Sequence, residues 1–326
     1  MLERWLAEQD VERVSDVLEV QLVTEGEPLE EDALYGYLGQ ELLRNYVVPG
    51  ELAAVFSDLG VPEVADHLVK HKFPSVERIR NGDFGEALTG ALFRRMQRWR
   101  VPILKLRYKQ RPNQPVQGAD LLGFRLRVSP PLVAVPEVKT RTTKRLDVAV
   151  DASMSLKQVL DDLPSSVLFV VARLLEQGNA LAFRIARLLD DGFTVERHVV
   201  LVHDNDKWDD RITARLVTPE DEPTKLTVVR LTNLKDVITK AFTAATLAPG
   251  PPGPAQGEHS RCLIPAPQSG DSDGRPSRGM GGLHGVRSCV RRLSSIRSDI
   301  PTPACRTSLS MPSISRASTT LCASPS

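Results

Sequence analysis

The order of apolar patterns between residues 81 and 231 is the feature that most constrains the fold of this chain. A helical pattern at 81–99 places Phe84, Leu88, Leu92, Phe93 and Met96 on roughly one stripe. Three runs rich in aliphatic and β-branched residues follow, separated by turn-forming segments, and then a second helical region and further strands. The three runs lie at 101–110, 118–128 and 132–140, and the later strands at 194–205 and 225–231. We therefore predict an α/β fold with a mixed sheet and a core of order α, β, β, β, α, β.

The segments on either side of this core differ from it in composition. Residues 1–80 are acidic, and helical patterns at 30–48 and 50–71 predict a mostly helical N-terminal region before the domain at 81–247. Residues 248–326 contain no lysine and no aromatic residue and are dense in Pro, Ser, Gly and Arg. Such a segment buries too little apolar surface to offset its ordering entropy, so we predict a disordered tail. Translation of a shifted reading frame is an alternative origin for it.

Several classes of protein are excluded by what the sequence lacks. The N-terminus has no basic segment followed by an apolar one, and no run of about 18 uncharged apolar residues occurs, so we expect a cytoplasmic protein without a membrane span. The four cysteines lie in the last quarter with spacings that match no zinc or redox pattern. There is no phosphate-binding loop of the GxxxxGK(S/T) form, so any ATP-driven motor must be a partner.

The net charge of +1 conceals a strong segregation of charge. Residues 1–80 hold 17 Asp and Glu against 7 Lys and Arg, whereas residues 94–145 hold 14 Lys and Arg against 2 acids, Asp120 and Glu137. A basic stretch of this kind is typical of a surface that binds a phosphodiester backbone. The alternative is an ion-paired face that docks the acidic N-terminal region of the same chain.

The two acids of the basic stretch, and one lysine, fall in predicted strands. Asp120 lies on the second strand, and Glu137 and Lys139 lie two residues apart, and so on one face, near the end of the third. A charged side chain in a half-buried strand is costly unless it is paired or binds a cation. If the two strands pair as a hairpin, all three side chains can approach one point at the end of the sheet. An edge-strand ion pair and a turn-end aspartate are the plainer interpretation of these residues.

This grouping suits metal-dependent phosphodiester hydrolysis. Carboxylates of Asp120 and Glu137 can hold Mg²⁺, with Mn²⁺ as a substitute, and the metal lowers the pKa of a bound water. Lys139 can orient the nucleophile or stabilise charge that develops on phosphorus. Glu86, in the first turns of the preceding predicted helix, adds a third carboxylate ligand, although a role with the helix dipole would also explain it.

The same residues carry a resemblance to a known family. Gly118-Ala-Asp120 followed by Pro136-Glu137-Val-Lys139 resembles the PD-(D/E)XK nuclease superfamily, except that Gly-Ala stands where the superfamily has a proline before the aspartate. The segments NGDFGEALTGALFRR, QGADLLGF and PEVKTRTT are similar to the HamA C-terminal-like family, the nuclease component of Hachiman-type antiphage defence. The resemblance covers about 76–245. It implies a metal-dependent DNA endonuclease with Glu86, Asp120, Glu137 and Lys139 as its active site and a superfamily 2 helicase as its partner.

A DNA nuclease also needs cations that contact the backbone of its substrate. All but one of the DNA-contacting cations that we predict belong to the basic stretch, and the exception, Lys157, lies at the start of the following helix. The predicted cations are Arg94, Arg95, Arg98, Lys105, Arg107, Lys109, Arg141 and Lys157. An alternative function is a catalytically inactive module of the same fold that binds nucleic acid or a helicase. His203, Asp204 and Asp206, at the exit of a later strand, could bind a cation, but turn formation explains them better.

Overall fold

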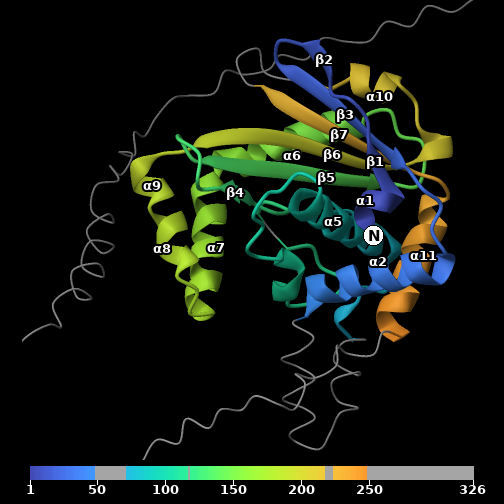
Figure 1. Ribbon diagram of the computed structural model, residues 1–326, viewed down its shortest axis with the longest axis horizontal. Helices are drawn as coiled ribbons and strands as arrows, with labels where there is room; N and C mark the ends of the chain where they lie inside the picture. The colour runs from blue at the N-terminus through green and yellow to red at the C-terminus, as the bar shows by residue number, and fades with distance from the viewer. Residues whose placement is uncertain (48–70, 117, 217–222, 248–326) are drawn as a thin grey trace, which may run out of the picture. The chain divides into compact units, whose positions relative to one another are not determined.

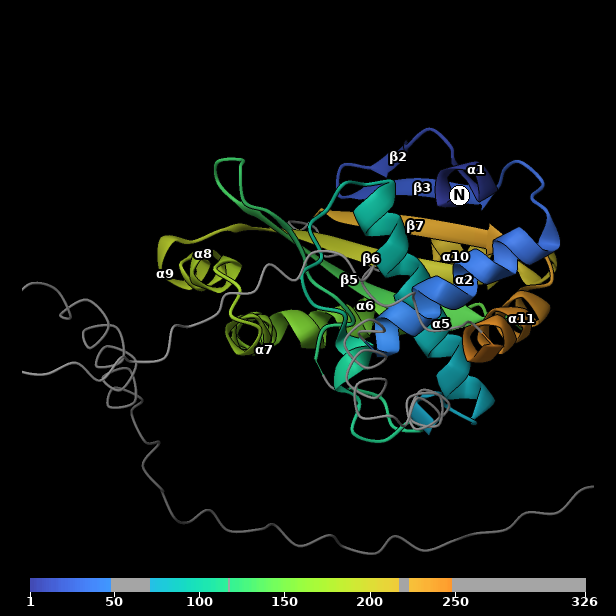
Figure 2. The same ribbon diagram turned by 60° about the horizontal axis from the view of Figure 1, so that its bottom comes forward.

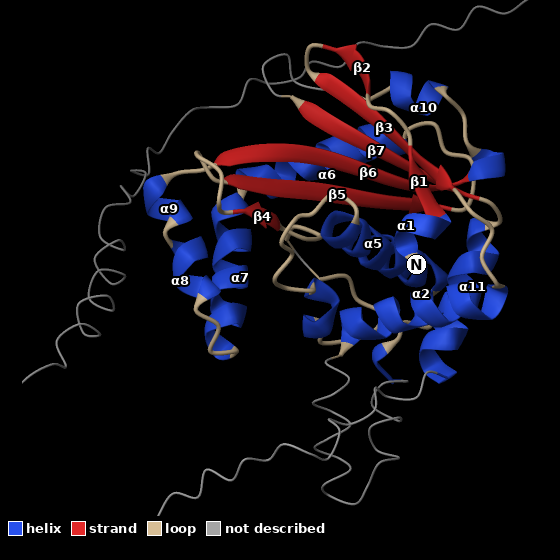
Figure 3. Cartoon of the chain, viewed as in Figure 1, coloured by secondary structure: helices blue, strands red, loops and turns tan. Residues whose placement is uncertain are grey.

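Strands from both ends of the chain build one curved sheet in the computed structural model, which describes residues 1–47, 71–116, 118–216 and 223–247 (Figures 1 and 3). The strand order is β1-β3-β7-β6-β5-β4, and β2 pairs with β3. β3, β7, β6 and β5 run parallel, and β1, β2 and β4 are antiparallel to their neighbours. The strands are β1 (Leu6–Glu8), β2 (Glu12–Ser15), β3 (Leu18–Glu25), β4 (Gly123–Arg125), β5 (Leu132–Arg141), β6 (Thr194–Asp204) and β7 (Thr224–Leu231). The predicted α/β fold with a mixed sheet is confirmed.

Helices cover both faces of the sheet. On one face lie α1, α2, α5 and α11, and behind it lies α6, with α7 to α9 continuing beside β4 (Figures 1 and 2). The helices are α1 (Leu2–Trp5), α2 (Glu31–Tyr46), α5 (Glu77–Arg95), α6 (Val148–Asp161), α7 (Leu163–Glu176), α8 (Leu181–Ala186), α9 (Leu188–Asp191), α10 (Arg211–Ala214) and α11 (Leu234–Leu247), with 3₁₀ turns η1 (Lys105–Tyr108) and η2 (Asn205–Lys207). None of these helices is long and apolar enough to cross a membrane.

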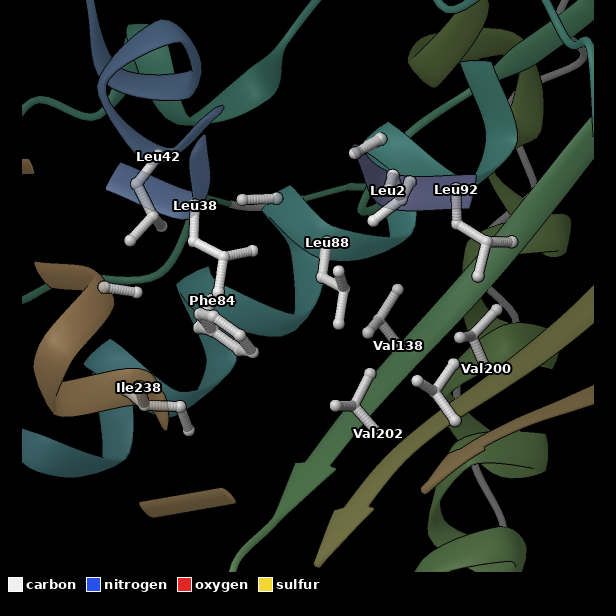
Figure 4. Packing of buried hydrophobic residues seen from close by; sticks show 14 of the residues in the cluster. Leu2, Leu38, Leu42, Phe84, Leu88, Leu92, Val138, Val200, Val202 and Ile238 are labelled. Atoms are coloured by element: carbon white, nitrogen blue, oxygen red, sulfur yellow. The ribbon is translucent and has the colours of Figure 1, made fainter. Parts of the chain in front are cut away.

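The core on the α5 face is built from the predicted apolar stripe. Phe84, Leu88, Leu92 and Phe93 are all buried, and Figure 4 shows Leu88 directed at Val138 on β5. Alternate residues of β5 therefore face opposite layers: Val138 joins the α5 core, whereas Val133 and Val135 join the core under α6 and α7.

The N-terminal region differs from its prediction. Residues 6–25 form three strands rather than helix, because β3 pairs in parallel with β7 over seven residue pairs, Leu18 with Thr224 through Thr24 with Arg230. The helix predicted at 30–48 is present as α2, and the one predicted at 50–71 lies outside the described residues, apart from its last residue. The tail predicted at 248–326 also lies outside them.

The prediction of a strand at 101–110 is also wrong. Arg100 makes one bridge with Phe124, after which the chain leaves the sheet and forms the 3₁₀ turn Lys105–Tyr108. Its apolar residues Ile103 and Leu106 are buried without strand partners, so burial alone explains the pattern that suggested a strand. The second predicted strand, 118–128, shortens to Gly123–Arg125.

Candidate functional site

The outer half of β5 is an open sheet edge. The short strand β4 pairs only with Leu132 to Ala134, so among the described residues the remainder of β5 has a strand neighbour on the β6 side alone. Glu137 and Lys139 lie in this outer half, on the face toward α6. The Lys139 ammonium donates to Glu137 Oε1 at 2.5 Å and to Ser155 Oγ on α6 at 3.1 Å. The predicted pair is therefore brought together and oriented by a serine.

Asp120 occupies the open edge itself. Its Oδ2 accepts a hydrogen bond from the backbone N–H of Val138 at 2.8 Å, so a side chain replaces the missing strand partner. The Lys105 ammonium lies 3.9 Å from Asp120 Oδ1 and donates to the Gly118 carbonyl at 2.8 Å. Gly118 has φ +86°, a conformation that favours glycine, and it turns the chain toward Asp120.

Glu86 approaches this edge from α5. The preceding residue, Gly85, packs so closely on β5 that an added Cβ would lie 1.9 Å from Thr140 Oγ1 and 3.2 Å from Val138 Cγ1. This close approach of helix and strand sets the position of Glu86. Its Oε2 is buried and has no hydrogen-bond partner within the described ranges, which is costly for a carboxylate.

Asp120 lies close enough to Glu86 and to Glu137 to raise the pKa of each. Burial raises the pKa of Glu86 well above its usual range, and the charge of Asp120 raises it further. Burial also raises the pKa of Asp120, against the opposing charge of Lys105. Burial, and then Asp120, raise the pKa of Glu137 to about 7, although Lys139 opposes the shift. Buried carboxyl groups that share a site in this way retain protons unless a cation joins them.

A second buried cluster adjoins Glu86. Asp83 lies one helical turn earlier on α5, and its Oδ2 accepts from Lys109 Nζ at 2.5 Å and from the Tyr46 hydroxyl of α2. Asp83 and Lys109 are both buried. α5 begins at Glu77, so Asp83 lies inside the helix, where it joins α2, α5 and the segment after η1.

The carboxylates of the site bear on whether a divalent metal fits here. Across the described part of the chain, no group of three or more His, Cys, Asp or Glu side chains converges as a ready metal site. The donor types fit nonetheless: Asp120, Glu137 and Glu86 supply hard carboxylate oxygens, which Mg²⁺ prefers, and Glu86 Oε2 has no other partner among the described residues. Asp120 and Glu137 instead accept hydrogen bonds from the Val138 N–H and from Lys139, respectively.

The cations predicted to contact DNA occupy different environments. Lys105 and Lys109 are buried and paired with Asp120 and Asp83, so they belong to the site and not to an outer surface. The Arg107 guanidinium donates to the carbonyl of Arg44 on α2.

Three of the predicted arginines pair with the N-terminal region. Arg94 and Arg95 both bond the carboxylate of Glu41 on α2, at 2.7 and 2.9 Å. Arg98 lies 3.8 Å from Glu3, with 79% of its side chain exposed. The structure thus supports the alternative of an intramolecular ion-paired face for these residues.

The last two predicted cations lie nearer solvent. Arg141, at the end of β5, is half-buried and donates to the Thr140 carbonyl. Lys157 on α6 is exposed. Of the predicted set, Arg95, Arg98 and Lys157 are exposed, and Arg95 is paired with the buried Glu41.

Sequence reasoning missed Ser155, the positioning role of Lys105 and the Asp83 cluster. The spacing of Asp83 and Glu86 was a usable signal, because residues three apart lie on one helix face. Ser155 carried no signal, since its contact with Lys139 depends on how α6 packs on β5. Asp204 forms the turn that we favoured for it, accepting from the backbone N–H groups of Asp206 and Leu234.

The fold and the site together define an α/β protein with a buried carboxylate and lysine cluster at an open sheet edge. The family model of HamA matches residues 1–245, so the chain belongs to the HamA family. This confirms the resemblance seen in the sequence, and membership supports a role in antiphage defence. No curated protein matches the chain significantly.

Proposed function

We propose that this protein is a metal-dependent DNA endonuclease of the PD-(D/E)XK type, the nuclease subunit of an antiphage defence system that acts with a superfamily 2 helicase. The observation that carries the proposal is that Asp120, at the open edge of β5, lies beside both Glu86 of α5 and the Glu137–Lys139 pair. Family membership agrees with it.

Each residue has a distinct task in this proposal. Asp120, Glu137 and Glu86 would hold Mg²⁺ or Mn²⁺, which when bound would supply a more acidic water and neutralise charge on the phosphate. Lys139, fixed by Ser155 beside Glu137, would stabilise the negative charge that develops on the phosphate oxygens as water attacks phosphorus and the P–O bond to the leaving oxygen breaks. Asp120 keeps its orientation through the Val138 N–H.

The test is incubation of the purified chain with plasmid and linear DNA in Mg²⁺ or in EDTA, with and without a helicase encoded beside it. We expect cleavage only with metal, reduced to the EDTA level by Glu137→Gln or Lys139→Met. The matched control is Glu176→Gln, which alters an exposed carboxylate paired with Arg173 on α7. Undiminished cleavage by both site variants would refute the assigned site.

Metal binding has a readout that does not need turnover. A metal that binds only the folded chain raises its thermal midpoint. We expect Mn²⁺ to raise the midpoint of the wild-type chain and of Glu176→Gln, and not that of Glu137→Gln. Metal stabilisation without cleavage, in every DNA and helicase condition, would favour an inactive binding module instead.

A further inference from the structure

A cavity of about 210 Å³ adjoins the carboxylate cluster. It lies between the first turns of α7 and the segments that carry Lys105 and Gly118. Ile103, Phe169 and Val170 contribute apolar walls. α7 continues beside β4 in Figure 1, so this cavity lies on the β4 side of the sheet. None of the four residues assigned to the cleavage reaction lines it.

The cavity is continuous in its lining with the catalytic site. A smaller cavity is lined by Glu86 and Asp120, and the two cavities share Ile103, Lys105 and Leu121. Lys105 therefore lies at their junction, where its ammonium bonds the Gly118 carbonyl and lies 3.9 Å from Asp120 Oδ1. A group that fills the larger cavity therefore contacts residues that also line the site of Glu86 and Asp120.

The lining indicates the chemistry of the occupant. Sites for drug-sized ligands run from about 300 Å³ upward, so this cavity suits a smaller flat group. Its walls are apolar and include the Phe169 ring, which the edge of Tyr108 supports at 5.6 Å between centroids. At the rim, Ser165 donates to Asp162 and Ser166 accepts from the Ala119 N–H, so Asp162 keeps free acceptor capacity and Ser166 keeps its hydroxyl proton.

An apolar slot with an aromatic wall, a polar rim and a cation at its inner end matches a nucleotide. The base would contact Phe169, its edge would meet the rim, and the attached phosphate would lie toward Lys105. Base contact with an aromatic side chain is the usual way in which proteins hold single-stranded nucleic acid. A paired base cannot enter a slot of this volume, because its partner base would have to enter with it.

We infer that this cavity holds one unpaired nucleobase of the substrate, next to the phosphodiester that the carboxylates address. The inference rests on the proposed nuclease function and narrows its substrate to single-stranded DNA. The helicase proposed as partner would supply such DNA.

The test is equilibrium binding of a fluorescein-labelled single-stranded oligonucleotide and the matching blunt duplex, in EDTA and at one fixed salt concentration, so that no DNA is cut. We expect Phe169→Ala to weaken single-strand binding about fivefold or more, the loss typical of one aromatic–base contact, and to leave duplex binding unchanged. The control is Leu168→Ala on the same turn of α7, which does not line the cavity and is 49% exposed.

A second variant separates loss of the base contact from a folding defect caused by Phe169→Ala. Ser165→Trp places a large side chain at the exposed rim and should also weaken single-strand binding, while both variants keep a cooperative thermal transition. Wild-type single-strand affinity in both variants, or equal weakening for single strand and duplex, would overturn the inference. Cleavage assays separate the two proposals. If the chain binds DNA as expected but never cuts it, the nuclease proposal alone is refuted. If the chain cuts DNA and both variants keep the wild-type preference for single strand over duplex, the cavity proposal alone is refuted.

Discussion

Buried charge is the dominant feature of this protein at the scale of single residues. The cluster at the edge of β5 and the adjoining Asp83 cluster combine carboxylates and ammonium groups that burial alone would exclude from a core. Their carboxylates are Asp83, Glu86, Asp120 and Glu137, and their ammonium groups belong to Lys105, Lys109 and Lys139. With every group ionised the acids exceed the bases by one, and Glu86 is the acid with an oxygen that has no partner in the described part. The negative charge of Glu86 would therefore balance part of the charge of a bound cation.

Tyr46→Phe tests the adjoining cluster. The Tyr46 hydroxyl donates to Asp83, and its burial beside that carboxylate raises the pKa of Tyr46. Loss of a hydrogen bond to a charged group should lower the free energy of unfolding by about 1.5–3 kcal/mol, measured by urea denaturation. Tyr37→Phe is the control, because the buried Tyr37 hydroxyl has no hydrogen-bond partner among the described residues. Equal losses in the two variants would show that the Asp83 contact contributes nothing.

At the scale of elements, the sequence predicted those that carry their own pattern. The α5 stripe of Phe84, Leu88 and Leu92 was found because its helical periodicity follows from burying one side. The strand that bears Glu137 is buried on both faces and was found from its run of aliphatic and β-branched residues. Residues 6–25 were missed because β3 is a strand only by pairing with β7, some 200 residues away in sequence. Residues 101–110 were misread because buried apolar residues in a 3₁₀ segment resemble a strand.

Gly85→Ala tests the contact between α5 and β5 that places Glu86. The new methyl group would meet Thr140 Oγ1 and Val138, so the helix must move away from the strand. We expect a loss of about 1–3 kcal/mol in the free energy of unfolding, as for other overpacked cores, together with loss of cleavage in Mg²⁺ because Glu86 moves too.

The matched control for this helix is Gly82→Ala. Gly82 also lies inside α5, but an added Cβ there would meet nothing within 4 Å. Alanine is the better helix former, so this variant should gain about 0.5–1 kcal/mol and keep its cleavage. Similar stability and activity in both variants would contradict the argument that Gly85 sets the position of Glu86.

At the scale of the whole molecule, the segregated charge of the sequence has two consequences that the sequence could not separate. The acidic N-terminal region packs α2 beside α5 (Figure 2), and the buried carboxylate of Glu41 accepts from both Arg94 and Arg95. Those arginines hold the molecule together. Arg98, with 79% of its side chain exposed, and the exposed Lys157 are in contrast accessible to a polyanion.

The two roles predict different responses to substitution. Replacing Arg94 and Arg95 together by Met removes the principal partners of Glu41 and should lower the free energy of unfolding by about 3 kcal/mol or more, because a buried carboxylate is left without adequate compensation. Replacing Arg98 and Lys157 together by Gln should leave that free energy nearly unchanged. It should instead reduce the slope of log affinity for DNA against log salt by about 0.9 for each of the two that contacts a phosphate. Urea denaturation and DNA titrations from 50 to 200 mM salt, in EDTA, measure both quantities. If the double Met variant of Arg94 and Arg95 reduces the salt slope of DNA affinity and leaves the free energy of unfolding unchanged, then these arginines bind DNA. The acidic N-terminal region would then have some other role than pairing with them.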